Sequence, residues 1–206
     1  MILFNKKVLV VGLGMTGVST ARFLKNMGAV VTVTDMAKED ELGDNVAIIR
    51  ELGINMELGS HENSTFENAD LIVLSPGVPH AIPQIQRAKD KGIDVLGEIE
   101  LASKFIDQPV IAITGTNGKT TTTTLLGEML KSSGFKVFVG GNIGSPLIGY
   151  VDRKEKAEIV VVEISSFQLD TIKSFKPKIS VLLNITEDHL DRYYDKRLCK
   201  IKMSDI

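Results

Sequence analysis

Seven short apolar runs rich in β-branched residues constrain the fold of this chain more than any other feature. Most are continuously apolar rather than alternating, which is typical of parallel strands covered on both faces. Helical patterns lie between several of them; in one, Val18, Ala21, Leu24 and Met27 share a face. Strands that alternate with helices predict an α/β fold. The runs are residues 7–11, 30–34, 71–74, 109–113, 136–139, 158–163 and 179–183.

A glycine-rich turn follows the first run. The stretch "GLGMTG" places Gly12, Gly14 and Gly17 in a G-x-G-x-x-G pattern, and Asp35 follows 18 residues after Gly17. This pattern is typical of a site that binds a diphosphate at a helix N-terminus and hydrogen-bonds a ribose through an acidic side chain. Taken alone, it supports an NAD-dependent oxidoreductase, another diphosphate ligand, or a tight turn without a ligand.

A second glycine turn, in "AITGTNGKTTTT", has the marks of a phosphate loop. Gly115 and Gly118 allow the backbone to wrap around phosphate oxygens at a helix N-terminus. Lys119 would reach the β- and γ-phosphates, and the Thr120 hydroxyl would ligate Mg²⁺. The eight-residue Walker motif G-x-x-x-x-G-K-[ST] is incomplete here, because Ile113 stands where its first glycine would be. A tight strand-to-helix turn with an incidental lysine therefore remains the alternative.

The helix after this loop has an unusual start. Threonines 120–124 are poor helix formers, and we interpret them as hydroxyls near an anion rather than as helix scaffolding. Leu125, Leu126, Met129 and Leu130 predict the apolar face of this helix.

Acidic residues and histidines supply the candidate metal ligands. Glu163 closes an apolar run with a carboxylate, which is costly to bury alone, so it is either a metal ligand or part of a structural pair. His189 follows the last run and has three acidic residues within two positions, which makes it a candidate metal ligand. His61 and His80 lack such settings, and we interpret both as loop residues.

Composition narrows the class of protein. The chain has 206 residues, 43% hydrophobic and 24% charged, as in ordinary soluble proteins. A net charge of −2 argues against nucleic-acid binding. Cys199 is the only cysteine, which excludes an internal disulfide and argues against a cysteine-based zinc site. No signal peptide pattern or membrane-spanning run is found, so we expect a cytoplasmic protein. We also expect a monomer. We expect two domains, at 1–97 and 98–206.

Four motifs occur in an order that carries a family resemblance: "GTNGKTTT", "GGNIG", "EISSFQLD" and "NITEDHLDRY". Together with "GLGMTG", "SPGVP" and "GEIELA", they make residues 1–193 resemble the Mur ligases of peptidoglycan synthesis. The resemblance implies a Rossmann-like N-terminal domain followed by a partial P-loop mononucleotide-binding domain. Its implied reaction is the ATP-dependent addition of D-glutamate to UDP-N-acetylmuramoyl-L-alanine through an acyl phosphate. A different Mur ligase, a non-catalytic nucleotide-binding module and an NAD-dependent oxidoreductase are the alternatives.

The resemblance also implies roles for individual residues. The glycine turn of the first domain would hold the diphosphate of UDP rather than of NAD. Lys119, Glu163 and His189 would be catalytic, with Mg²⁺ held by Thr120, Glu163 and His189. ATP would contact Gly115, Thr116, Asn117, Gly118, Lys119, Thr120 and Thr121. The substrate would contact Met15, Thr16, Asp35, Ser75, Gly77, Asn142, Ser165 and Gln168. For Ser165 and Ser166, helix N-capping is the competing interpretation.

Two departures from the family pattern bear on function. The family has a carbamylated, metal-bridging lysine after the "TEDH" histidine, and neither Lys200 nor Lys202 can be assigned that role. By their motifs, residues 194–206 align only weakly with the family, and we assign them no role. We therefore expect the N-terminal portion of a ligase, with no D-glutamate-dependent turnover by itself.

Overall fold

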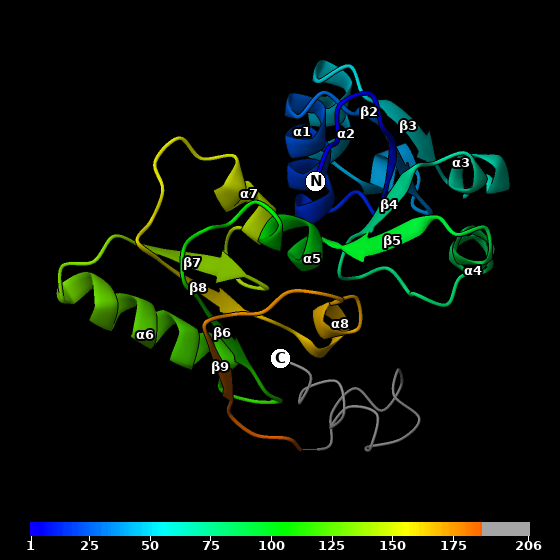
Figure 1. Ribbon diagram of the computed structural model, residues 1–206. Helices are drawn as coiled ribbons and strands as arrows, with labels where there is room; N and C mark the ends of the chain where they lie inside the picture. The colour runs from blue at the N-terminus through cyan, green and yellow to red at the C-terminus, as the bar shows by residue number, and fades with distance from the viewer. Residues whose placement is uncertain (187–206) are drawn as a thin grey trace. The chain divides into compact units, whose positions relative to one another are not determined.

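Two parallel sheets organise the computed structural model, which describes residues 1–186 (Figure 1). The chain divides into unit 1, Met1–Lys104, and unit 2, Phe105–Ile206. Every strand pair in both sheets is parallel, as the continuously apolar runs predicted. The α/β class is therefore confirmed.

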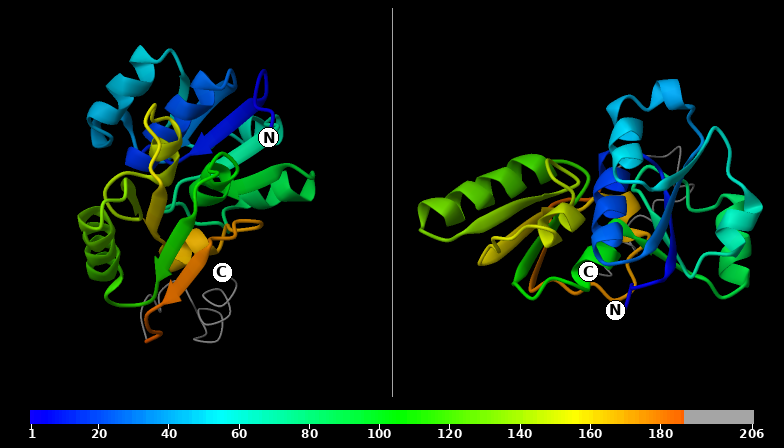
Figure 2. Two further views of the ribbon diagram at one scale, coloured as in Figure 1. Left: turned by 60° about the vertical axis from the view of Figure 1, so that its left-hand side comes forward. Right: turned by 90° about the horizontal axis from the view of Figure 1, so that it is seen from above.

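Unit 1 contains a five-stranded sheet in the order β3-β2-β1-β4-β5. Helices α1 and α2 pack together on one face of this sheet, and α3 and α4 pack together on the opposite face (Figures 1 and 2). The strand order reverses between β1 and β4, where α/β sheets bind ligands. The strands are β1 (Lys7–Val11), β2 (Val30–Asp35), β3 (Asn55–Leu58), β4 (Leu71–Leu74) and β5 (Asp94–Gly97). The helices are α1 (Met15–Asn26), α2 (Asp44–Glu51), α3 (Asn63–Glu67), α4 (Pro83–Asp90) and α5 (Glu98–Ser103), with a 3₁₀ turn at Glu39–Glu41.

The core of unit 1 includes a cluster where β1 and β4 meet α3 and α4. Leu9, Ile72, Phe66 and Ile85 are buried there. Burying each such side chain stabilises the fold by about 1.5–3 kcal/mol. This packing holds the carboxyl ends of β1 and β4 side by side.

Unit 2 is a four-stranded sheet in the order β7-β8-β6-β9, and α6 packs along β7, β8 and β6 (Figures 1 and 2). The strands are β6 (Val110–Thr114), β7 (Val137–Gly141), β8 (Ile159–Glu163) and β9 (Ile179–Leu182). The helices are α6 (Lys119–Ser132), α7 (Leu147–Val151) and α8 (Ser166–Leu169). Because β6 and β8 are parallel neighbours, the phosphate-loop candidate and Glu163 lie at the same edge of the sheet, where the carboxyl ends of these strands meet.

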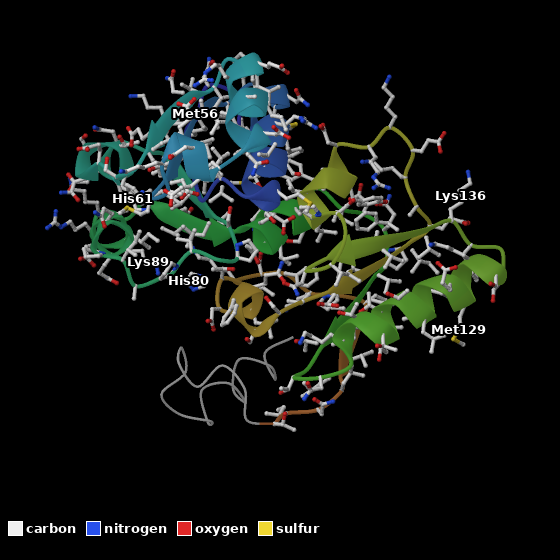
Figure 3. All side chains as sticks on the ribbon, turned by 180° about the vertical axis from the view of Figure 1, so that it is seen from behind. Met56, His61, His80, Lys89, Met129 and Lys136 are labelled. Carbon is white, nitrogen blue, oxygen red and sulfur yellow. The ribbon has the colours of Figure 1, made fainter. Side chains whose placement is uncertain are left out.

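The buried face of α6 matches the predicted apolar face only in part, because Leu126 and Leu130 are half-buried but Leu125 and Met129 are not. Leu125 and Met129 are 59% and 58% exposed, and Figure 3 shows Met129 pointing away from the helix. Thr123 and Gly127 are buried instead. A Cβ on Gly127 would lie 2.4 Å from Cγ2 of Val139, so this glycine lets helix and strand approach closely. Close packing, rather than hydropathy, therefore selects the buried face, and Thr123 belongs to the helix scaffold.

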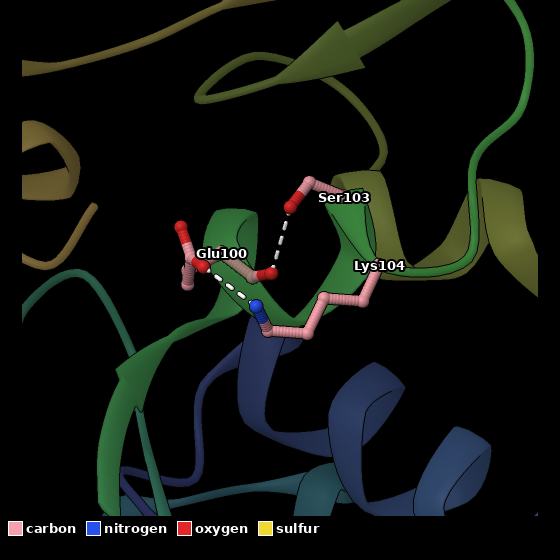
Figure 4. Close-up of polar contacts among 3 residues, drawn as sticks. All are labelled: Glu100, Ser103 and Lys104. Atoms are coloured by element: carbon pink, nitrogen blue, oxygen red, sulfur yellow. Dashed lines mark hydrogen bonds and ion pairs between the residues drawn. The ribbon is translucent and has the colours of Figure 1, made fainter. Parts of the chain in front are cut away.

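Helix α5, the last helix of unit 1, has an ion pair between a buried glutamate and a partly exposed lysine. The Glu100 side chain is fully buried, and one of its oxygens accepts a hydrogen bond from Lys104 Nζ at 2.8 Å (Figure 4). Ser103 Oγ donates to the Glu100 carbonyl oxygen at 2.8 Å. Helix α5 packs against β4 and β5, and unit 1 ends at Lys104, after this helix rather than at residue 97 before it.

Within residues 1–186, no helix has the length and apolar character that a membrane crossing requires.

Candidate functional site

The candidate phosphate loop leaves β6 at Thr114 and enters α6 at Lys119. Gly115 and Gly118 have positive φ angles of 142° and 83°, which favour glycine. No side chain caps α6, so its first N–H groups are available at a helix N-terminus. Lys119 Nζ donates to the carbonyl oxygens of Gly115 and Thr116, each at 2.9 Å. The lysine ammonium therefore folds back over the loop that precedes it.

Glu163 joins three separate segments at the edge of this sheet. Its side chain is buried, and Oε2 accepts a hydrogen bond from Thr120 Oγ1 at 2.8 Å. Oε1 accepts from Asn142 Nδ2, also at 2.8 Å. A Cβ on Gly141 would lie 2.4 Å from the Glu163 carbonyl oxygen, so the strand that leads to Asn142 must carry glycine. Sequence analysis selected these three polar residues separately, and the structure brings them together.

The donor set at this point fits a magnesium ion. Thr120 and Glu163 offer a hydroxyl and a carboxylate oxygen, and Mg²⁺ prefers oxygen ligands with only one or two carboxylates beside phosphates and water. Among residues 1–186, no group of three or more His, Cys, Asp or Glu side chains could form an all-protein metal cage. The arrangement suits a metal that arrives with a nucleotide.

Thr116 and Asn117, both predicted to contact ATP, are hydrogen-bonded to the segment after β9. Thr116 N donates to the Asn184 carbonyl oxygen at 3.0 Å, and Asn117 N donates to Asn184 Oδ1 at 2.9 Å. Sequence analysis did not select Asn184. Because these two N–H groups are engaged, the N–H groups at the start of α6, which no side chain of residues 1–186 caps, are the loop's candidate donors for an anion. Thr121, the last predicted ATP contact, is exposed in the first turn of α6.

The glycine turn of unit 1 uses each of its glycines differently. A Cβ on Gly17 would lie 1.9 Å from the Gly12 carbonyl oxygen, and Gly12 has a φ of 96° and contacts Ser75. Gly14 has open space around it and stands at the N-terminus of α1, which no side chain caps. Gly12 and Gly17 thus shape the turn, and Gly14 leaves its outer side accessible.

Asp35 supports this turn from the end of β2. Its Oδ2 accepts from Leu13 N at 2.6 Å, and its Oδ1 accepts from Ala37 N at 2.9 Å. Both oxygens are used within the protein, so Asp35 has a structural task here whatever it binds.

The other substrate-contact candidates of unit 1 lie near the same turn. Met15 is exposed and Thr16 half-buried in the first turn of α1. Ser75 Oγ donates to the Gly12 carbonyl oxygen at 3.0 Å, and Gly77 is exposed two residues further on. Ser75 therefore ties β4 to the first glycine across the strand switch.

A cavity of about 380 Å³ opens beside this turn. Gly12 and Asp35 line it together with His61, Val78 and Gln84. A second cavity, of about 300 Å³, is lined by Lys7 at the start of β1 and lies away from the turn. The larger cavity is the one that joins the glycine turn to the candidate acid.

His61 lies in the loop between β3 and α3, as predicted, and it also lines this cavity. Its Nδ1 lies 2.8 Å from Thr34 Oγ1, and its ring meets Phe66 edge to face. Burial lowers the pKa of His61, while Asp35 and Glu57 act in the opposite direction. The signal was available in principle, because His61 follows the strand beside β2, but β3 itself was not predicted.

Ser165 and Gln168 form a capping box at the start of α8. Gln168 N donates to Ser165 Oγ at 3.4 Å, and Ser165 N donates to Gln168 Oε1 at 2.9 Å. Ser165 thus caps α8, which was the competing interpretation of this residue. A substrate contact from either residue remains a prediction. His189, Cys199, Lys200 and Lys202 lie outside the described residues.

Two family models match most of the chain. "Mur ligase MurD-like, N-terminal domain" matches residues 6–97, and "Mur ligase middle domain" matches residues 113–201. The first covers the sheet and glycine turn of unit 1. The second begins inside β6 and includes the phosphate loop, Asn142 and Glu163.

Curated relatives point the same way. The chain is 61% identical over 191 residues to a UDP-N-acetylmuramoylalanine–D-glutamate ligase of Desulfosudis oleivorans, covering 93% of this chain and 42% of that protein. It is 57% identical over 189 residues to the ligase of that name from Desulfatibacillum aliphaticivorans, covering 92% and 42%. The chain therefore spans less than half the length of these relatives.

Solved structures share the fold. A UDP-N-acetylmuramate-alanine ligase from Thermotoga maritima matches with a TM-score of 0.57 and 24% identity, over 97% of this chain and 47% of that one. A UDP-N-acetylmuramate:L-alanyl-gamma-D-glutamyl-meso-diaminopimelate ligase from Neisseria meningitides matches with a TM-score of 0.60 and 19% identity, over 96% and 66%.

Proposed function

The chain belongs to the Mur ligase family, and from that premise we propose that it provides the substrate-nucleotide unit and part of the ATP unit of a ligase. The proposed reaction adds D-glutamate to UDP-N-acetylmuramoyl-L-alanine during peptidoglycan synthesis, with ATP as the energy source. The identity of 61% to a relative with this printed name supports that choice over other Mur ligases. We place the reaction in the cytoplasm, where ATP is available, and expect the chain to act as a monomer.

Unit 1 would bind the UDP part of the substrate. The uncapped N-terminus of α1 offers N–H groups to a diphosphate, and Gly14 lets it approach the backbone. Met15 and Thr16 stand at this helix end, while Ser75 and Gly77 lie on the strand switch beside it. Asp35, on the cavity wall, would face the uracil. No lysine or arginine stands in this turn, which suits a diphosphate better than a triphosphate.

Unit 2 would bind Mg²⁺ and ATP. The ATP phosphates would lie on the N-terminus of α6, and Lys119 would exchange its two carbonyl partners for phosphate oxygens. Thr120 and Glu163, with His189 from the segment beyond residue 186, would hold the metal. When bound, Mg²⁺ neutralises charge that develops on the transferring phosphoryl group.

The proposed reaction has two steps. The alanyl carboxylate of the substrate attacks the γ-phosphorus of ATP, which forms an acyl phosphate and releases ADP. The amine of D-glutamate then attacks the acyl carbon, forms the amide and releases phosphate. Lys119 acts in the first step because negative charge is greatest on the phosphoryl oxygens there. Asn142, Ser165 and Gln168 would orient the substrate.

The contact of Thr120 and Asn142 with one buried carboxylate carries this proposal. A carboxylate at a strand end is costly to bury, and here both oxygens are hydrogen-bonded within reach of the phosphate loop. The Thr120 hydroxyl and the Glu163 carboxylate beside a phosphate loop are oxygen donors of the kind that Mg²⁺ prefers. The network therefore favours ATP with Mg²⁺ over an incidental lysine in a tight turn.

Calorimetric titration of the chain with three ligands tests the proposal. We expect separate saturable binding of UDP-N-acetylmuramoyl-L-alanine and of Mg²⁺-ATP, each unaffected by NAD. NAD binding that competes with the UDP substrate would instead support an oxidoreductase. Absence of Mg²⁺-ATP binding in the folded chain would refute the role of unit 2.

A further inference from the structure

The phosphate loop of unit 2 is held from outside by the segment that follows β9. Besides the two bonds already described, Asn184 Nδ2 donates to the Asn117 carbonyl oxygen at 3.0 Å. Asn117 Nδ2 donates to Thr186 Oγ1 at 3.3 Å. Thr186 N donates to Thr116 Oγ1 at 3.0 Å, and Thr116 Oγ1 donates to the Thr186 carbonyl oxygen at 3.4 Å. We call Asn184 and Thr186 the loop clamp.

The clamp explains why position 115 must be glycine. A Cβ there would lie 3.1 Å from both N and O of Asn184 and 3.1 Å from Cβ of Leu183. This is tighter than ordinary van der Waals contact, and the φ of 142° disfavours other residues as well. Gly115 is therefore required by the chain behind the loop, whether or not a phosphate lies in front of it.

The clamp also decides which way the loop's polar groups face. The Asn184 side chain forms hydrogen bonds with both main-chain groups of Asn117. Its oxygen accepts from the N–H, and its NH₂ group donates to the carbonyl oxygen. On the other side of the loop, Lys119 Nζ contacts the carbonyl oxygens of Gly115 and Thr116. When phosphate draws the lysine away, the contacts from the clamp still hold Thr116 and Asn117.

We propose that Asn184 is a positioning residue for the nucleotide, supported by Thr186, and that together they preorganise the loop so that the start of α6 receives the phosphates. The inference rests on the proposed function, since it deepens the role of the same ATP site. Asn184 does not touch the phosphates itself. It raises the fraction of chains whose loop is in the conformation that binds the nucleotide. The apparent affinity is proportional to that fraction.

Exposure of the clamp separates this role from a structural one. Asn184 and Thr186 are both exposed, so their hydrogen bonds compete with water and add little to global stability. Their effect on nucleotide affinity is larger, because these hydrogen bonds form only in the loop conformation that binds the nucleotide. Loss of the clamp should therefore change nucleotide affinity more than the unfolding midpoint.

Titration of Asn184→Ala with Mg²⁺-ATP is the main test. The variant loses the two side-chain bonds to Asn117 and keeps the main-chain bond from Thr116. We expect the Kd to rise about 5- to 30-fold, as two modest hydrogen bonds would give. We also expect little change in the urea unfolding midpoint, and an unchanged Kd for UDP-N-acetylmuramoyl-L-alanine in unit 1.

Thr186 provides a matched pair of variants. Thr186→Val keeps the shape but removes the acceptor for Asn117 Nδ2, and we expect the Kd for Mg²⁺-ATP to rise about 2- to 5-fold. Thr186→Ser keeps the hydroxyl and should bind as the unmodified chain does. A merely structural role predicts shifts in stability without this difference in Kd.

The outcomes separate the inference from the proposed function. If the unmodified chain binds Mg²⁺-ATP and folded Asn184→Ala binds it equally well, the positioning role is wrong and the proposed function stands. If Asn184→Ala does not fold, equal Kd values for Thr186→Val and Thr186→Ser overturn the role. If the unmodified chain binds no Mg²⁺-ATP, the proposed function fails and the positioning role fails with it.

Discussion

The two glycine turns begin alike, after a parallel strand and before a helix without a side-chain cap, but they are held in different ways. The turn of unit 1 is fixed by Asp35, which accepts from the N–H of Leu13, and by Ser75 on the neighbouring strand. The turn of unit 2 is fixed by Lys119 within the loop and by the loop clamp behind it.

The charges that face each turn differ more than their backbones do. An anion at the first turn would meet helix N–H groups and no basic side chain from the turn itself. An anion at the second would meet Lys119 and the hydroxyl of Thr120, with the buried Glu163 carboxylate beside it. The comparison indicates that the glycine pattern fixes where a phosphate can lie. The side chains around the turn then fix how much charge it can carry and whether a metal accompanies it.

The largest effect is expected for Gly17→Ala, which tests whether glycines within one turn are equivalent. The new Cβ would lie 1.9 Å from the Gly12 carbonyl oxygen, so the turn must move. We expect a loss of about 3 kcal/mol in the free energy of unfolding, measured with urea. Gly14→Ala, with open space around it, should lose less than about 1 kcal/mol. Equal losses would show that the turn adapts freely.

A crossed pair of variants tests whether the two turns serve different ligands. Lys119→Ala should weaken Mg²⁺-ATP binding about 10- to 100-fold, as loss of charge-assisted hydrogen bonds predicts, and leave the UDP substrate unaffected. Gly14→Val should weaken binding of UDP-N-acetylmuramoyl-L-alanine and leave ATP unaffected, because its side chain blocks the diphosphate. Calorimetry gives four dissociation constants. The two-ligand assignment fails if Lys119→Ala weakens both ligands equally.

Glu163→Gln tests the metal part of the comparison. The amide can still accept from Asn142, and the Thr120 hydroxyl can rotate to accept from it, so we expect the fold to persist. The enhancement of ATP binding by Mg²⁺ should fall about tenfold, since a neutral oxygen is a poorer ligand for the ion. The measurement is ATP titration with and without Mg²⁺. A large loss of stability with unchanged binding would make Glu163 a structural residue only.

The smallest effect concerns the pH dependence of unit 1 stability. Burial lowers the pKa of His61 in the folded chain, so below the ordinary value of about 6.5 the unfolded chain binds the proton more readily. Stability should therefore fall as pH falls from about 6.5 towards the folded-state pKa, and the effect should be small because the His61 ring is only partly buried. Urea unfolding of the chain and of His61→Gln, at about pH 7.5 and about pH 5, should show a smaller decrease for the variant. An equal decrease in both would assign the effect to other groups.

The sequence was most informative where a residue's task is local. β1 and β4 were predicted with their observed bounds, and β6 and β8 within one residue at each end, because strands buried on both faces leave continuous apolar runs. β3 was missed because it is an edge strand, half exposed, with Asn55 and Glu57 among its four residues. A strand of this kind carries no pattern that separates it from a loop.

The candidate site was predictable residue by residue but not as a set of contacts. Lys119, Thr120, Glu163 and Asn142 were selected from their motifs, but their mutual bonds depend on the strand order β7-β8-β6. Asn184 was not selected because its partner, Asn117, is 67 positions earlier. Met129 misled the prediction for α6, because apolar spacing marks a face without showing whether that face is covered.

The loop clamp also bears on when the ATP site can form during synthesis of the chain. Asn117 leaves the ribosome 67 residues ahead of Asn184, and Thr116 leaves 70 residues ahead of Thr186. At about 5–20 residues per second, the loop waits roughly 3–14 seconds for its clamp. The glycine turn of unit 1 needs Ser75, 63 residues after Gly12, and the cavity beside it needs Gln84; both are made before β6. If the proposed assignment of the two turns is right, the site for the UDP-linked substrate would form in the nascent chain before the site for ATP.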